Sequence, residues 1–301
     1  MILKFLSVFS AIICFSVCSV HAAESSCRPL KIVTSFSILK DFIEKITAGV
    51  NTLSINSIVP VEADPHTYQP TPHDSRTLAH ADIIFINGLD FEKGIEKLII
   101  TSGFGGKLYT VSQGLKPRTQ PLDPHLWHDV KNAKRYVKRM AEVLIRHDPV
   151  HQHIYHQNTV KLLERLDKLE AWVHQTFATI PLAQRLVVTT HDAFWYFGQA
   201  YQVQFLAPLG ISTESEATAQ NVSCLIKFIR MKKVKAVFVE NLANPRLLQQ
   251  IAEETKVPLQ GVLYADSLSA PDGPAADYEA MIRHNTLTIQ RALQGAPLCK
   301  P

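Results

Sequence analysis

Two copies of one tripeptide carry side chains that could bind a metal ion together. Asp64-Pro65-His66 and Asp123-Pro124-His125 are accompanied by His191, in Thr-Thr-His-Asp, and by Asp266, in Leu-Tyr-Ala-Asp-Ser. Each lies where an apolar run meets a polar turn, the place where the end of a strand presents side chains to a crevice. Three imidazoles and one carboxylate would fill the four positions of a closed first-row metal site. The pattern therefore predicts a metal site assembled from four separate loops.

Each of these residues also has an ordinary explanation. A single Asp-Pro-His would be read as a turn histidine in solvent, and it is the second copy at a similar junction that favours a metal site. His191 could instead be the base of a hydrolytic triad, although no Gly-x-Ser-x-Gly elbow and no cysteine in a nucleophile context accompanies it. Asp266 precedes Ser-Leu-Ser, where an aspartate often only stabilises a turn.

The other histidines are not expected to bind the same ion. His128 follows His125 by three residues, a spacing that shares a metal only when both lie on one helical face. Pro124 and Asp129 bracket a turn at this point, which disfavours His128 as a ligand. The remaining mature histidines are predicted to lie on solvated faces: His73, His80, His147, His151, His153, His156, His174 and His284.

The first residues have the pattern of an export signal. Lys4 precedes an apolar stretch from Phe5 to Val20 and then small residues, which predicts a signal peptide over residues 1–22. The stretch is short for a membrane span, which needs about 20 residues, so a cleaved signal is favoured. An uncleaved membrane anchor is the alternative. Cys14 follows Ile13 and Cys18 follows Val17, whereas a lipoprotein needs a small residue before its modified cysteine. We therefore expect a periplasmic protein with a cleaved signal that is not an obvious lipoprotein.

Composition limits the other classes of function. The formal charge of +4 becomes +3 (4 − 1) once Lys4 is removed, which is too weak and dispersed to predict nucleic-acid binding. Cys27, Cys224 and Cys299 remain after cleavage, so one disulfide and one free thiol are expected, with the pairing open. These cysteines lack Cys-x-x-Cys spacing and are not assigned to metal.

Apolar periodicity predicts an α/β fold with two lobes, each a mainly parallel sheet flanked by helices. The longest helical pattern, His151 to Ala178, lacks glycine and proline and would span about 40 Å, so it is expected to join the lobes as one long rigid helix. The expected units are an N-terminal lobe over 23–150, a connecting helix over 151–180 and a C-terminal lobe over 181–301. Strands are predicted at 30–35, 50–61, 82–87, 107–111, 185–190, 203–207, 235–240 and 258–263, and the other helices at 39–48, 72–80, 92–100, 130–147, 194–201, 216–231, 245–255 and 277–293.

Five segments resemble, in order, the motif series of the zinc/manganese-binding proteins of bacterial ABC importers. They are residues 64–72, 82–89, 123–127, 191–197 and 210–216, and the resemblance covers essentially the whole mature chain. It implies two α/β lobes joined by a long rigid helix, with one divalent ion held in the cleft as cargo. It also implies that His66, His125, His191 and Asp266 are the ligands, and that a protein acting as a monomer delivers the ion to a membrane permease.

The sequence departs from this family pattern in two places that bear on the choice of metal. Manganese-leaning members commonly carry glutamate where this chain has His191, and many zinc members carry a His/Asp-rich loop where residues 113–122 contain neither residue type. His128 stands where leucine is more usual. Three imidazoles and one carboxylate suit zinc better than manganese, which prefers more oxygen ligands, so zinc is favoured over manganese or iron.

A site filled by four protein ligands leaves no position for a catalytic water, so we do not expect an enzyme. The alternatives are a secreted zinc-dependent hydrolase and a metal-sequestering adhesin. A rigid connecting helix would restrict hinge closure, so release is expected to use small lobe motions or rearrangement of one ligand loop.

Overall fold

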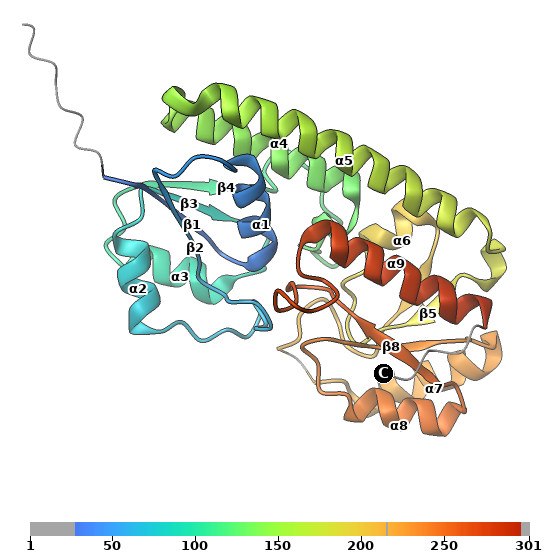
Figure 1. Cartoon of the computed structure of the whole chain (residues 1–301). Coiled ribbons are helices and arrows are strands. Elements are labelled where there is room, and N and C mark those ends of the chain that lie inside the picture. The colour runs from blue at the N-terminus through green and yellow to red at the C-terminus, as the bar shows by residue number, and fades with distance from the viewer. Residues whose placement is uncertain (1–27, 215, 296–301) are drawn as a thin grey trace, which may run out of the picture.

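Two four-stranded parallel sheets organise the chain, which the computed structural model describes over residues 28–214 and 216–295 (Figure 1). The first sheet has the order β2-β1-β3-β4, with β1 at Leu30–Thr34, β2 at Leu53–Ser57, β3 at Ile83–Ile86 and β4 at Lys107–Thr110. The second repeats this order as β6-β5-β7-β8, with β5 at Leu186–Val188, β6 at Gln204–Leu206, β7 at Val237–Glu240 and β8 at Leu259–Leu263. The predicted α/β fold with two lobes is confirmed. The predicted signal peptide, Cys27 and Cys299 lie outside the described residues.

Helices flank both sheets. In the first lobe these are α1 (Ser37–Ile46), α2 (Pro72–Ala79) and α3 (Lys93–Thr101), followed by α4 (Val130–His147). In the second lobe α7 (Ala219–Lys232) and α8 (Arg246–Thr255) cover one face of the sheet, while α6 (Trp195–Tyr201) and α9 (Tyr278–Gln294) lie on the face toward the long helix (Figure 1). Parallel strands with helices on both faces explain why the inner strands β3 and β5 contain apolar residues alone.

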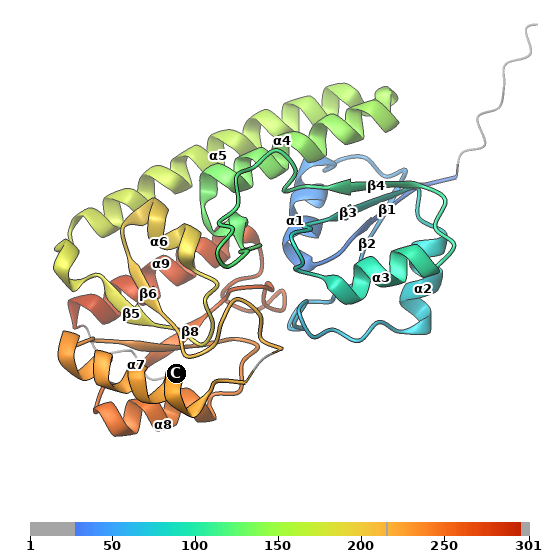
Figure 2. The ribbon, with the colours of Figure 1, turned by 180° about the vertical axis from the view of Figure 1, so that it is seen from behind.

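The long helix α5, Gln152–Ala178, runs along both lobes (Figure 2). It packs against α1 and α4 on the side of the first sheet and against α9 and α6 on the side of the second. Its buried residues recur at helical spacing from Tyr155 through Leu162, Leu166 and Leu169 to Phe177. This stripe lies on one side of the helix, so α5 forms a spine to which both lobes are attached.

The hydrophobic core continues from one lobe into the other. One cluster of buried apolar residues includes β1 and β3, α4, α5 and α9, whereas a smaller second cluster lies beneath α7 and α8. Trp127 lies where the lobes meet: its Nε1 donates to the Ala265 carbonyl at 3.0 Å, and its own carbonyl accepts from Tyr278 Oη at 2.7 Å. The lobes are therefore packed together through side chains as well as joined by α5.

Most boundaries agree with the predicted ones, and the differences have local causes. Helix α7 begins three residues later than expected because the Thr218 side chain accepts a hydrogen bond from Asn221 N and caps it. Strand β2 is shorter than the predicted 50–61 run. Within the described residues no helix is long and apolar enough to cross a membrane. Cys224 is exposed on α7 and has no disulfide partner in the described part of the chain.

Candidate metal centre

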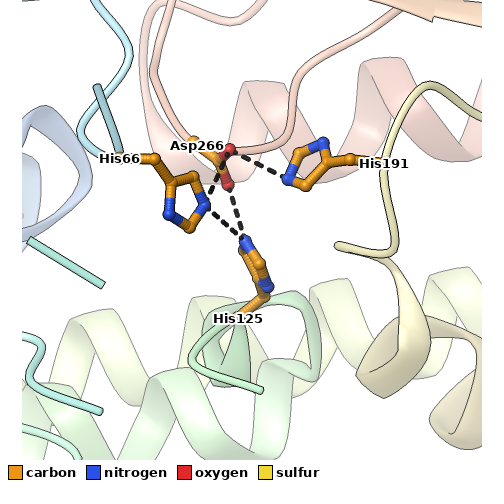
Figure 3. Close-up of side chains that lie close together, drawn as sticks. All are labelled: His66, His125, His191 and Asp266. Atoms are coloured by element: carbon orange, nitrogen blue, oxygen red, sulfur yellow. Dashed lines mark hydrogen bonds and ion pairs between the residues drawn. The ribbon is translucent and has the colours of Figure 1, made fainter. Parts of the chain in front are cut away.

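The four residues singled out by the sequence come together between the two lobes (Figure 3). His66 lies between β2 and α2, and His125 lies directly before a single 3-10 turn, Leu126–His128, that leads into α4. His191 follows β5 and Asp266 follows β8. Each segment therefore leaves the carboxyl end of a parallel strand, the edge at which α/β sheets bind ligands.

The donor atoms are spaced as ligands around one small ion would be. The Nε2 atoms of His66 and His125 are 3.2 Å apart, and the Asp266 carboxylate lies 3.3 Å from His125 Nε2 and 3.2 Å from His191 Nε2. One donor atom from each of the four residues lies within 4.8 Å of all the others. Bonds of about 2.1 Å in a tetrahedron place ligand atoms roughly 3.4 Å apart, so these separations fit a single divalent ion.

The repeated Asp-Pro-His is a local device that orients a histidine. Asp64 Oδ1 accepts a hydrogen bond from His66 N at 2.9 Å, and Asp123 Oδ1 accepts one from His125 N at 3.0 Å. In both copies the aspartate bonds the backbone two residues later, as in an Asx turn, while proline fixes the residue between them. This turn, which explains the aspartate in the motif, directs each imidazole toward the cleft.

Two of the three imidazoles are also held by buried carboxylates on the side away from the cluster. His125 Nδ1 bonds Asp123 Oδ1 at 2.9 Å, and His191 Nδ1 bonds Glu240 Oε2. A carboxylate only accepts, so Nδ1 carries the proton and the neutral ring presents the lone pair of Nε2 to the cluster. Glu240 was not singled out from the sequence, although an acid that closes the apolar strand Val237–Glu240 was a usable signal.

Burial and mutual charge set the protonation of these side chains. Burial lowers the pKa of His66 to about 3. Burial alone would lower the pKa of His125, but Asp266 and Asp123 outweigh it and raise this pKa to about 9. Burial would raise the pKa of Asp266, yet the charges of His191 and His125 hold it well below its usual range. A metal ion that binds here must displace protons from imidazoles, so binding weakens as the pH falls.

Aromatic rings shield the cluster from solvent. The Phe91 ring lies 4.8 Å from the His66 ring, and Trp127 lies 5.3 Å from His125, measured between centroids. His125 is fully buried, whereas His66 retains 8% of its exposure. An apolar surround of this kind strengthens electrostatic attraction to a bound cation and limits access of water.

The other histidines take no part in the cluster. His128 is fully buried, its ring lies 4.5 Å from Phe194, and neither ring nitrogen has a hydrogen-bond partner among the described residues. Burial lowers its pKa to about 3, so the imidazole is neutral. None of the eight histidines predicted on solvated faces is buried.

Structural comparison defines the class of protein. The periplasmic zinc-binding protein TroA from Treponema pallidum superposes with a TM-score of 0.83 at 29% identity, covering 90% of this chain and 100% of that chain. A manganese-bound periplasmic metal-binding protein from Candidatus Liberibacter asiaticus gives a TM-score of 0.79 at 26% identity, covering 87% and 99%. The chain thus has the fold of two-lobed periplasmic metal-binding proteins.

Sequence comparison narrows the class to a family. The family model for the periplasmic zinc-uptake complex component A matches residues 32–292, and the chain belongs to this family. The manganese-binding lipoprotein MntA of Halalkalibacterium halodurans is 33% identical over 267 residues, 88% of each chain. The manganese ABC transporter substrate-binding lipoprotein PsaA of Streptococcus pneumoniae is 31% identical over 285 residues, 90% of this chain and 91% of that one. The resemblance in the motifs is confirmed at the level of the family.

Proposed function

We propose that this protein binds one divalent first-row metal ion between its lobes and delivers it to the membrane permease of an ABC importer. The observation that carries the proposal is the buried convergence of His66, His125, His191 and Asp266 within 4.8 Å of one another. Relatives named as substrate-binding proteins of metal transporters support the delivery step. The metal is therefore cargo, and the four side chains are its ligands.

Zinc is the proposed cargo. Three neutral imidazoles and one carboxylate form a set of borderline softness that suits Zn²⁺, while Mn²⁺ prefers more oxygen ligands. The relatives are named for zinc in one case and for manganese in others, so their names do not decide between the two metals. The donor set supports zinc, with manganese and iron as the competing ions in the test below.

We propose that the site does not catalyse a reaction. Four protein ligands complete a tetrahedral set and leave no position for the activated water of a zinc hydrolase. Phe91 and Trp127 pack against the imidazoles, and the nearby carboxylates of Asp123 and Glu240 are engaged in hydrogen bonds to the Nδ1 atoms of His125 and His191. Metal-dependent hydrolysis of ester, peptide or phosphate substrates by the purified protein would contradict this part of the proposal.

The proposed setting is the periplasm, which the chain reaches by export and cleavage of residues 1–22. The mature protein would have lobes over 23–150 and 181–301, joined by the helix over 151–180. It would act as a monomer and would not bind nucleic acid. The expectation that the chain is not a lipoprotein has no support from the relatives, several of which are named lipoproteins. Cys27 does follow a small residue, Ser26. The mass of the mature N-terminus decides whether Cys27 carries lipid.

Native mass spectrometry with elemental analysis of protein isolated from its own periplasm tests the function directly. We expect one zinc ion per chain. Protein stripped of metal should rebind one Zn²⁺. The His66→Ala and His191→Ala variants should each lose most of the zinc affinity, whereas His73→Ala, at an exposed histidine, should keep it. Tight stoichiometric binding by the double variant of His66 and His191 would overturn the ligand assignment.

A further inference from the structure

The mouth of the cleft is divided into two cavities, and only the smaller one is lined by a residue of the metal cluster. That cavity has a volume of about 170 Å³ and is lined by His66, Phe91 and Pro124 from the first lobe and by Ile211, Ser212 and Glu214 from the second. A larger cavity of about 510 Å³ is lined by Asp64, Thr67, Thr190, Thr213 and Glu216, without any of the four proposed ligands. Size alone would favour the larger cavity, but the smaller one leads to a ligand.

A hydrogen bond between the lobes lies in the wall of the larger cavity. Thr213 Oγ1 donates to Asp64 Oδ2 at 2.6 Å. The two copies of Asp-Pro-His differ here: the Asp123 carboxylate bonds the ring of its own histidine, whereas Asp64 bonds the opposite lobe. His66 is consequently the one proposed ligand histidine whose Nδ1 has no hydrogen bond within the described residues, and it is the most exposed of the four. Of the three imidazoles, it is the one held least firmly.

We propose that the metal ion enters and leaves through the smaller cavity, and that His66 is the first ligand it meets on entry and the last it leaves on release. The proposal rests on the proposed function. A volume of 170 Å³ holds roughly six waters at about 30 Å³ each, which is room for a partly hydrated divalent ion. Two acids, Asp90 and Glu214, and one base, Lys93, line the cavity. Lys93 pairs with Asp90 at 3.7 Å, so the charge of Glu214 is left over and attracts cations to the mouth. His125, His191 and Asp266 then complete the ligand set farther inside.

Blocking the cavity tests the route without touching a ligand. Ser212→Trp fills the smaller cavity, and Ala217→Trp, which lines the larger one, is the matched control. Zinc loading and release are followed by stopped-flow fluorescence with a zinc indicator and a chelator. We expect Ser212→Trp to slow both rates at least tenfold and to leave the equilibrium constant within threefold, because a blocked path changes rates alone. The control should exchange zinc within twofold of the parent rate.

Exchange by Ser212→Trp at the parent rate, or equal slowing by Ala217→Trp, would overturn the route. Leu122→Trp, which narrows the same cavity from the other lobe, replaces Ser212→Trp if the latter does not fold. If the parent chain binds no zinc, the proposed function itself fails. If the parent binds zinc and the blocking variants exchange it freely, only the route fails.

The charge at the rim and the access to His66 give two further readouts. Glu214→Gln should lower the association rate severalfold at low salt, with the difference vanishing at high salt, whereas Glu216→Gln beside the larger cavity should not. Diethyl pyrocarbonate should modify His66 of the metal-free parent at least tenfold faster than His66 of metal-free Ser212→Trp, as mapped by peptide mass spectrometry. Equal modification of His66 in the two proteins, or an unchanged rate in Glu214→Gln at low salt, would contradict the inference.

Discussion

His125 and His191 each bond a buried carboxylate through Nδ1, Asp123 for the first and Glu240 for the second. The same carboxylates also accept backbone N–H groups, from His125 N at 3.0 Å and from Thr190 N at 2.9 Å, so their own positions are fixed. Held in this way, an imidazole has one tautomer and one direction before the metal arrives. At the scale of residues, these acids orient two of the proposed ligands before a metal ion binds.

Replacing Glu240 with glutamine tests this preparation. Glu240→Gln removes the charge opposite His191 Nδ1, and we expect the zinc affinity to fall about 10- to 100-fold. Competition with a chelator of known affinity measures the change, and the exposed Glu216→Gln serves as control. Unchanged affinity, in a variant whose metal-free melting temperature matches the parent, would show that His191 needs no carboxylate behind it.

His128 allows a prediction of the opposite sign. Its two ring nitrogens are buried without partners among the described residues, an arrangement that costs about 1–3 kcal/mol. We therefore expect His128→Leu to raise the free energy of unfolding by about that amount and to leave zinc affinity within threefold. Urea unfolding and zinc titration measure both effects, with His128→Gln as the polar control. A loss of stability in His128→Leu would mean that the ring has a favourable role in the native state.

At the scale of elements, the turn between β3 and α3 combines an unfavourable backbone conformation with hydrogen bonds that stabilise it. Gly88, Leu89 and Asp90 all have positive φ, between 60° and 78°, and a Cβ on Gly88 would lie 2.5 Å from Thr110 Cγ2. The buried Glu92 carboxylate accepts hydrogen bonds from Asn87 N at 2.6 Å and Gly88 N at 3.1 Å. The left-handed conformation of Leu89 and Asp90 is unfavourable by itself, so Glu92 stabilises the turn that places Phe91 against His66.

Glu92 should make stability depend on pH. Burial raises its pKa from 4.5 to about 7, so the folded state binds a proton more tightly than the unfolded state does. The resulting stabilisation is complete below the unfolded pKa and is lost as the pH rises through the folded value. Through Glu92, the unfolding free energy of the parent should fall by roughly 2–3 kcal/mol between pH 5 and pH 8. In Glu92→Gln we expect this fall to be absent. Urea unfolding at both pH values checks this, and the exposed Glu44→Gln should retain the parent's decrease.

Elements were predictable where a local signal was unambiguous. Helix α4 begins and ends at the predicted residues because Asp129 caps it and Pro149 closely follows it. Strand β2 was overestimated because apolar residues continue to Val61, beyond the part paired with β1. The four cluster residues were singled out by the repeated Asp-Pro-His, by apolar runs that end at His191 and before Asp266, and by the family resemblance, but their approach to one another depends on how the lobes pack. Glu240 ends an apolar strand, but that signal does not by itself pair it with His191, 49 residues away, so the sequence did not single it out.

The whole molecule behaves as one packed unit because the core continues through α4, α5 and α9 from one lobe to the other. A ligand that binds between the lobes therefore stabilises the entire chain. We expect saturating zinc, at about 100 times its dissociation constant, to add about 2.7 kcal/mol and to raise the melting temperature by about 5–10 °C. Scanning calorimetry with and without zinc, then after a chelator, checks this. No shift at saturation, or separate transitions for the lobes, would contradict a shared core.

The α5 spine has a further consequence for how empty and loaded carrier compete for the transporter. Because both lobes pack against α5, we expect the empty and the loaded carrier to have nearly the same outline, which would give a transporter little basis for telling the two apart. We expect the empty form to occupy the transporter almost as well as the loaded form, and surplus empty carrier to slow uptake. Uptake by reconstituted vesicles at fixed loaded carrier, measured while empty carrier is added, should decline as empty carrier competes for the same docking position. Insensitivity of uptake to the empty form would mean that the transporter reads the local arrangement of the cleft instead.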